Sequence, residues 1–111
     1  GLEEGEWFYE IGDHLEEGRY EYGLKQGVWK HTYVTTREVR FEGEFYDDLP
    51  QGKHVWYYDT GIKRLEGEYI SGIKDGLWRR FDKEGSILIS IDYQSGNEVK
   101  VDGYKLKFEE K

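Results

Sequence analysis

Three histidines, His14, His31 and His54, are the residues of this chain best suited to bind a metal ion. A zinc ion would need their ring nitrogens about 2 Å from one common point. The chain repeats about every 24 residues, and in that frame His54 occupies the position of Trp29 and Trp78. Equivalent positions lie on strands that are separated by another strand, roughly 10 Å apart. We therefore expect each histidine to fill a place in the repeat, and we predict no metal site.

Paired carboxylates are the second group with chemical potential, because two of them flanking a sugar bond can hydrolyse a glycoside. Two similar segments alternate charged with apolar residues: Arg40, Glu42 and Glu44, then Arg64, Glu66 and Glu68. This spacing puts the charges on one face of neighbouring strands, where opposite charges stabilise each other. We predict a charge ladder without catalytic activity, whose four glutamates attract a basic partner.

Asp59-Thr60-Gly61 is the triplet of aspartic proteases, whose chemistry needs two facing aspartates that share a proton. The next repeat has Lys83-Glu84-Gly85 in the same place, between two predicted strands. All three residues of the triplet suit a hairpin turn, which is the simpler interpretation. The chain also has no cysteine and no glycine-rich phosphate loop. We predict a protein that is not an enzyme and has no cofactor.

Four tryptophans recur near the repeat spacing: Trp7, Trp29, Trp56 and Trp78. A single sheet has little else to bury, so we expect Trp29 and Trp78 in the core. Residues 55–58 are apolar or aromatic on both faces, and one sheet by itself buries only one of them. Trp56, Tyr57 and Tyr58 are therefore open to two interpretations, as core residues or as anchors for a partner.

The composition indicates a protein of strands and turns. The 111 residues suffice for one domain and include 15 Gly, 10 Tyr, 5 Phe, 4 Trp and no Ala, which disfavours helices. The formal net charge of −8 argues against nucleic-acid binding, which depends on neutralising phosphates. It also makes an anionic membrane an unfavourable partner. A protein partner, and a basic one, is favoured.

A repeat of about 24 residues runs through the chain as Gly-x-aromatic-x-x-(Gly/Asp)-x-x-x-Gly. Its members are Gly18, Tyr20, Gly23 and Gly27, then Gly43, Phe45, Asp48 and Gly52, then Gly67, Tyr69, Gly72 and Gly76, and finally Tyr93 and Gly96. We place the repeats at 5–26, 27–51, 52–75 and 76–99, with a capping strand at 100–111, in a single domain 1–111. A glycine inside a strand weakens it, so we expect a Trp of a neighbouring strand to lie over each one.

Each repeat predicts two antiparallel strands joined by a short turn. The first strands are expected at 6–11, 28–34, 54–59 and 77–82, the second at 15–22, 39–46, 63–70 and 87–93, with glycine-rich loops between repeats. The predicted fold is all-β, an antiparallel meander that forms an elongated twisted single sheet of about eight strands, with a ninth at 104–108. Alternation places Val39, Phe41, Lys63, Leu65 and Ile87 on its apolar face.

The segment Leu65-Glu66-Gly67-Glu68-Tyr69-Ile70-Ser71-Gly72-Ile73-Lys74-Asp75-Gly76 resembles a MORN repeat, as do Phe41-Glu42-Gly43-Glu44-Phe45 and Gly18-Arg19-Tyr20. The usual glycine two residues after the closing one gives way to Trp29, His54 or Trp78, as in the MORN variant of bacterial proteins. The resemblance covers residues 5–98. It implies hairpins stacked into an elongated sheet, motif residues with structural roles, and an interaction scaffold, with antitoxin or immunity components among such proteins.

The hairpin Val55-Trp56-Tyr57-Tyr58-Asp59-Thr60-Gly61 is also similar to choline-binding and clostridial-type cell-wall repeats, which hold a ligand between aromatic rings. The sequence thus predicts a protein-binding module, of antitoxin or immunity type in its specific form. A cell-envelope glycan- or choline-binding module and a structural spacer are the alternatives. The predicted partner-binding residues are Trp56, Tyr57, Tyr58, Glu42, Glu44, Glu66 and Glu68.

Overall fold

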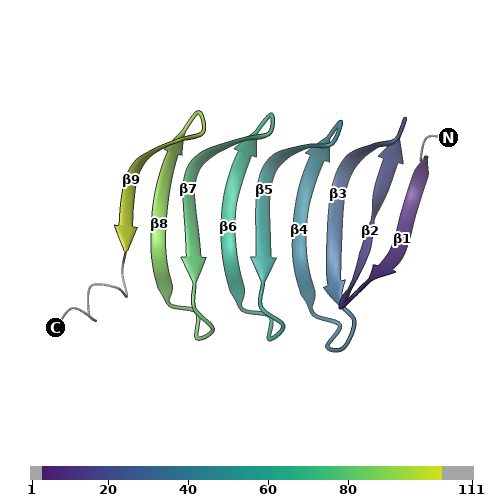
Figure 1. Ribbon diagram of the computed structural model, residues 1–111, viewed down its shortest axis with the longest axis horizontal. Coiled ribbons are helices and arrows are strands. Elements are labelled where there is room, and N and C mark those ends of the chain that lie inside the picture. Colours follow the sequence, from purple (N-terminus) through teal and green to yellow (C-terminus); the bar gives the residue numbers. More distant parts are fainter. Residues whose placement is uncertain (1–3, 104–111) are drawn as a thin grey trace.

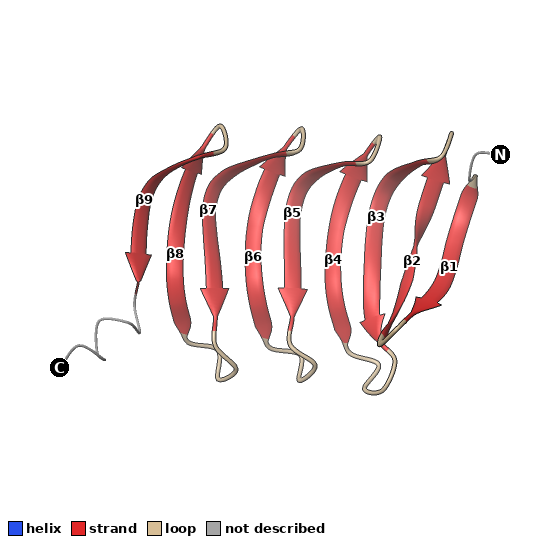
Figure 2. Ribbon diagram, in the orientation of Figure 1, coloured by secondary structure: helices blue, strands red, loops and turns tan. Residues whose placement is uncertain are grey.

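The computed structural model describes residues 4–103, apart from the side chain of Tyr9, as one open sheet of nine strands (Figures 1 and 2). The strands are β1 (Gly5–Ile11), β2 (His14–Glu21), β3 (Leu24–Tyr33), β4 (Val39–Tyr46), β5 (Leu49–Tyr57), β6 (Lys63–Ile70), β7 (Ile73–Phe81), β8 (Ile87–Gln94) and β9 (Asn97–Gly103). Each strand pairs antiparallel with the next along the chain. The predicted all-β meander is confirmed. Residues 4–103 contain no helix that could cross a membrane.

The sheet is elongated, with extents of 57 × 36 × 16 Å, and Figure 1 shows β1 and β9 at its opposite edges. β9 begins at residue 97, within what we expected to be the last repeat. The ninth strand predicted at 104–108 lies outside the described residues, as does most of the predicted capping strand at 100–111. The single sheet thus continues the meander to the end of its described part.

Tight turns join the repeats where glycine-rich loops were predicted. Tyr22 and Gly23 have φ values of 54° and 77°, and the turns at 47–48, 71–72 and 95–96 have two positive φ values in the same way. Two left-handed residues make a type I′ turn, whose twist matches that of the flanking strands. The prediction of longer loops was wrong: β3, β5 and β7 begin at Leu24, Leu49 and Ile73, immediately after these turns.

The closing glycines explain that difference, because they lie inside strands. Gly27, Gly52 and Gly76 have φ values of 75°, 76° and 74°. The register shifts beside each of them, so β3, β5 and β7 each carry extra residues opposite the preceding strand. These are bulges, which a glycine with positive φ accommodates without strain. Asp75, between the strands predicted at 63–70 and 77–82, accordingly lies in β7.

An aromatic face is built from rings that lie over glycines. A Cβ on Gly18 would come within 2.1 Å of the Trp29 ring, and one on Gly67 within 1.9 Å of the Trp78 ring. The prediction that a neighbouring tryptophan covers the strand glycine is confirmed for both. His54 covers Gly43 in the same manner, with a ring nitrogen 2.5 Å from the position of a Cβ.

Each covering ring also makes an equivalent hydrogen bond. Trp29 Nε1 donates to the backbone oxygen of Arg19 at 3.2 Å, and Trp78 Nε1 to that of Glu68 at 3.1 Å. His54 Nε2 lies 2.8 Å from the backbone oxygen of Glu44, the corresponding acceptor. The polar atom of each ring is thereby satisfied, as a buried N–H requires. His54 is a shape and hydrogen-bond substitute for tryptophan.

Most of the buried core is this ring layer; Val55, on the opposite face, is also buried. Trp29 is fully buried and Trp78 is 4 % exposed, so the prediction that both are core residues is confirmed. Lysines complete the cover: the Lys25 ammonium lies 5.0 Å from the Trp29 ring, and the Lys74 ammonium 4.9 Å from the Trp78 ring. Lysine side chains whose ammonium groups lie over the ring faces add cation–π attraction and help a single sheet to cover large aromatics.

The assignment of Val39, Lys63 and Ile87 to the apolar face was wrong. The register shifts by one residue immediately N-terminal to Phe41, Leu65 and Ile89. The residues that precede the shift in each strand therefore face the opposite side of the sheet. Lys63 consequently reaches Glu66 on the other face. A one-residue bulge reverses the side that every preceding side chain faces, and period-two alternation cannot reveal it.

Candidate functional site

The face opposite the aromatic rings carries a row of directly paired residues, here called the charged face. The row contains Lys30, Glu42, Val55, Glu66, Arg79, Ser90 and Asp102. A parallel row, one position nearer the type I′ turns, includes Glu44 and Glu68. Glu42, Glu44 and Glu68 are exposed, and no ion pair joins them to another residue within 4–103. Lys30 and Lys53 lie directly opposite Glu42 and Glu68 in the register but form no ion pair with them, so these carboxylates remain accessible to a partner.

Glu66 differs from the other predicted glutamates because it is 5 % exposed. Its carboxylate accepts hydrogen bonds from Lys63 Nζ at 2.9 Å and from Arg79 Nη2 at 2.5 Å. Burial alone raises the pKa of Glu66, but these hydrogen bonds outweigh burial and hold the pKa below its usual 4.5. The charge of Glu66 is compensated inside the chain, so this residue holds the sheet together and is not available to steer a partner.

The three predicted aromatic anchors are half-buried. The Trp56 ring lies on the aromatic face, with its centroid 5.1 Å from that of Phe41 and 6.0 Å from that of Trp78. The Tyr58 hydroxyl donates to the backbone oxygen of Phe81 at 2.7 Å. The Tyr57 backbone oxygen accepts a hydrogen bond from the Tyr33 hydroxyl at 2.9 Å. The structure therefore gives the side chains of Trp56 and Tyr58 roles within the sheet, whereas Tyr57 contributes its backbone oxygen.

An open hollow of about 470 Å³ lies at the β1 end of the charged face. Its lining includes the carboxylates of Glu6, Glu17 and Glu42, together with Phe8 and Val28, which are 64 % and 58 % exposed. Lys30 is the basic residue in this lining. A hollow with more carboxylates than cations and an apolar floor suits the long, amphipathic side chain of a lysine or arginine.

Exposed apolar side chains form a ridge beside the type I′ turns, here called the turn ridge. Its members, between 49 % and 76 % exposed, are Tyr22, Tyr46, Leu49, Ile70 and Ile73. Tyr46 and Ile70 each follow a glutamate of the charged face by two positions and share its side of the sheet. We did not predict this ridge. Its signal was the spacing of 24 residues between Tyr46 and Ile70, the last strand residues before turns that we had taken for loops.

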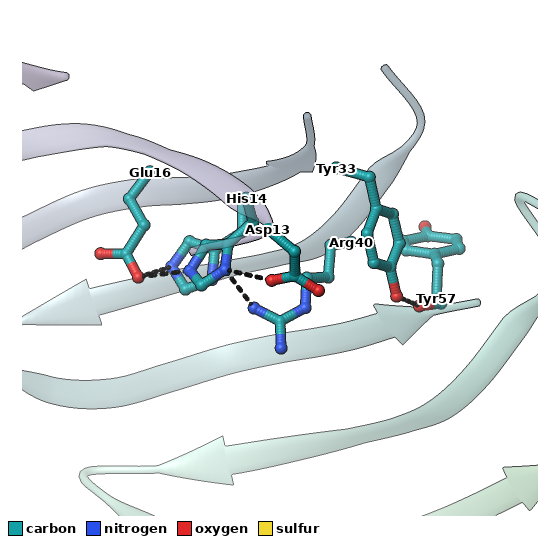
Figure 3. Close-up of polar contacts among 7 residues, drawn as sticks. Asp13, His14, Glu16, Tyr33, Arg40 and Tyr57 are labelled. Carbon is teal, nitrogen blue, oxygen red and sulfur yellow. Dashed lines mark hydrogen bonds and ion pairs between the residues drawn. The ribbon is translucent and has the colours of Figure 1, made fainter. Parts of the chain in front are cut away.

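Two of the three histidines meet on the aromatic face, contrary to our expectation. The rings of His14 and His31 stack with centroids 5.0 Å apart and an interplanar angle of 23°. Figure 3 shows Glu16 beside His14. Glu16 Oε2 lies 2.8 Å from His14 Nε2 and 3.6 Å from His31 Nε2. The prediction that about 10 Å separates the histidines compared only equivalent positions. His14 and His31 are on adjacent strands, and β2–β3 pairing sets His31 directly opposite Glu16.

The second ring nitrogen of His14 has partners of its own (Figure 3). His14 Nδ1 lies 3.2 Å from Asp13 Oδ1 and 2.6 Å from Arg40 Nη1. The hydrogen bond to His14 lowers the pKa of Asp13, so this carboxylate stays charged at neutral pH. Burial of the ring lowers the pKa of His31 to about 4, so its imidazole is neutral at pH 7.

The remaining predicted motif is a turn. Asp59 and Thr60 are exposed, and the Gly61 amide donates to the Tyr58 backbone oxygen at 3.0 Å. This is the hairpin turn that we predicted for Asp59-Thr60-Gly61. Comparison of the chain with protein-family models gives no match, and no curated protein is significantly similar to it.

Proposed function

We propose that this chain is a non-catalytic binding module that recognises a basic protein through its charged face. The observation that carries the proposal is the set of exposed carboxylates Glu42, Glu44 and Glu68, which no cation within residues 4–103 neutralises by an ion pair. They belong to a chain whose formal net charge is −8. Carboxylates in this arrangement accelerate the approach of a positively charged surface and orient it.

Exposed apolar side chains also support the charged face as the binding surface. The turn ridge borders the charged face, and Val28 and Leu77 are exposed on it by 58 % and 52 %. Interfaces combine such apolar area with charge, because desolvated apolar groups supply affinity and charges supply orientation. The hollow between Glu17 and Glu42 adds a place for one basic side chain of the partner. A partner with a lysine- or arginine-rich surface and a few apolar side chains fits this description.

The MORN-like repeat pattern agrees with this proposal, since it implies an interaction scaffold. Occlusion of a basic toxin, as by an antitoxin or immunity protein, is its specific form. Glycan or choline binding through Trp56, Tyr57 and Tyr58 has weaker support. Such sites need free ring faces, whereas Trp56 packs between Phe41 and Trp78.

The test uses two variants with equal net charge. One replaces Glu42, Glu44 and Glu68 by lysine, and the control replaces Asp59, Glu84 and Glu98, which are exposed on two turns and on β9. Both changes raise the formal net charge from −8 to −2. We expect wild type and control to retain one stoichiometric basic protein from the source lysate at low salt, and the charged-face variant to lose it. Equal retention by both variants would exclude the charged face, and equal loss would reduce the effect to net charge.

A further inference from the structure

We propose that His14, Glu16 and His31 form a binding site for one divalent transition-metal ion, with Zn²⁺ as the ion that suits the donors. Two imidazole nitrogens and a carboxylate oxygen are the donor types that zinc takes in proteins. The three ligand atoms lie within 4.8 Å of one another. Two adjacent strands supply the donors, so the hairpin that holds them needs no rearrangement of its backbone.

The distances between donors suit an ion. Bonds of 2.0–2.2 Å in a tetrahedral site separate neighbouring donor atoms by roughly 3.4 Å. Glu16 Oε2 lies 2.8 Å from His14 Nε2 and 3.6 Å from His31 Nε2, on either side of that value. The two histidine nitrogens are at most 4.8 Å apart, so side-chain rotations that move each donor atom by about 1 Å would bring all three onto one ion. Three protein ligands leave a fourth position open to water or to a partner's side chain.

Neighbouring residues hold the three proposed metal ligands in position. The side chains of His14, Glu16 and His31 are only 12 %, 13 % and 19 % exposed, so their positions are restricted by packing. A metal-binding histidine ordinarily donates its other ring N–H to a carboxylate, which fixes the ring orientation. Asp13 Oδ1, 3.2 Å from His14 Nδ1, is placed for that role (Figure 3).

Arg40 should weaken metal binding, so replacing it tests the proposal with a predicted direction of change in affinity. Its guanidinium lies 2.6 Å from His14 Nδ1 and competes with Asp13 for that atom, because donation from Arg40 needs the ring proton on Nε2, whereas the hydrogen bond to Asp13 needs it on Nδ1. Metal binding at Nε2 needs the other tautomer, with the proton on Nδ1 directed to Asp13. Arg40 therefore competes with the ion through hydrogen bonding as well as through charge. Arg40→Met removes both effects, whereas Asp13→Asn removes the supporting carboxylate.

The experiment titrates ZnCl₂ into the full 111-residue chain, purified without a polyhistidine tag and stripped of metal, at pH 7.5 by calorimetry. We expect one equivalent to bind, with binding lost in His14→Gln, Glu16→Gln and His31→Gln. We expect Arg40→Met to bind more tightly and Asp13→Asn about tenfold more weakly. His54→Trp is the matched control, because His54 points at the Glu44 backbone and tryptophan occupies its place in two other repeats.

A measurement on the unaltered chain guards against misfolded variants. Zinc should shift the imidazole ¹⁵N resonances of His14 and His31 and leave those of His54 unchanged. The assignment is overturned if wild type takes up no zinc at 100 μM, if the ligand variants bind as wild type does, or if His54 responds with the other two. Unchanged affinity in Arg40→Met would likewise overturn the geometry assigned to His14.

Discussion

Gly67→Ala tests the central packing relation of the sheet, the contact between a strand glycine and the covering ring. The added Cβ would lie 1.9 Å from the Trp78 ring, whereas carbon atoms in contact are about 3.5–4.0 Å apart. The ring must therefore move by roughly 1.5 Å. That movement breaks the hydrogen bond that Trp78 Nε1 donates to the Glu68 backbone oxygen, which is 3.1 Å long in the wild type.

Opposing terms set the size of the effect. Overpacking a closely packed site costs about 1–3 kcal/mol, and loss of the buried indole hydrogen bond adds about 1 kcal/mol. Replacing a strand glycine by alanine gains roughly 0.5–1 kcal/mol of backbone entropy. The clash outweighs that gain, so we expect a net loss of about 2 kcal/mol in the free energy of unfolding. Domains of this size are stable by about 5–15 kcal/mol, so the variant should still fold.

Urea denaturation followed by tryptophan fluorescence measures this loss directly. With a urea dependence of about 1–2 kcal/mol/M, the midpoint should fall by about 1–2 M. Gly43→Ala is the graded comparison, because its Cβ would meet the smaller His54 ring at 2.5 Å and should cost less. A Gly67→Ala chain as stable as wild type would refute the explanation that the glycine exists to admit the ring.

Three further predictions concern other parts of the sheet. Burial lowers the pKa of His54 below its usual 6.5, so on acidification the unfolded chain binds a proton at His54 more readily than the folded chain does. The free energy of unfolding should therefore fall as pH drops below about 6.5. The decrease in urea midpoint between pH 7 and pH 5 should be smaller in His54→Trp. Arg79→Met should lower the free energy of unfolding by about 1–2 kcal/mol, because buried Glu66 keeps only Lys63; an unchanged midpoint would show that the pair contributes nothing. Trp56→Ala should cost about 3 kcal/mol through lost contact with Phe41 and Trp78; retained stability with lost partner binding would instead make Trp56 an interface anchor.

The repeat could be recognised in the sequence because its glycines recur for a local physical reason. Gly23 and Gly72 adopt the left-handed conformation of type I′ turns, and Gly27 and Gly76 that of bulges. Such requirements act within a few residues, so they appear as a pattern along the chain. Gly18, Gly43 and Gly67, which lie inside strands, indicated where an aromatic ring packs on the sheet, since only a missing side chain leaves room for a ring.

Strand limits and face assignments were less predictable. The closing glycines belong equally well to a loop or to a bulge, and only pairing with the preceding strand decides between them. The bulges near Arg40 and Arg64 moved Val39 and Lys63 to the other face by the same mechanism. Local composition does not record this register, because the hydrogen bonds that set it join residues distant in sequence.

The sequence by itself determined the class of fold, the repeat, the ring over the strand glycine and the presence of a charged face, because each follows from spacing and residue type. The tertiary structure alone decided which charges are exposed and which histidines meet. Glu66 looks like Glu42 in sequence, yet Lys63 and Arg79 enclose it. His14 and His31 are 17 residues apart and occupy different repeat positions, but the register of β2 and β3 stacks their rings beside Glu16. Exposure and proximity are properties of paired strands, and pairing depends on the whole sheet.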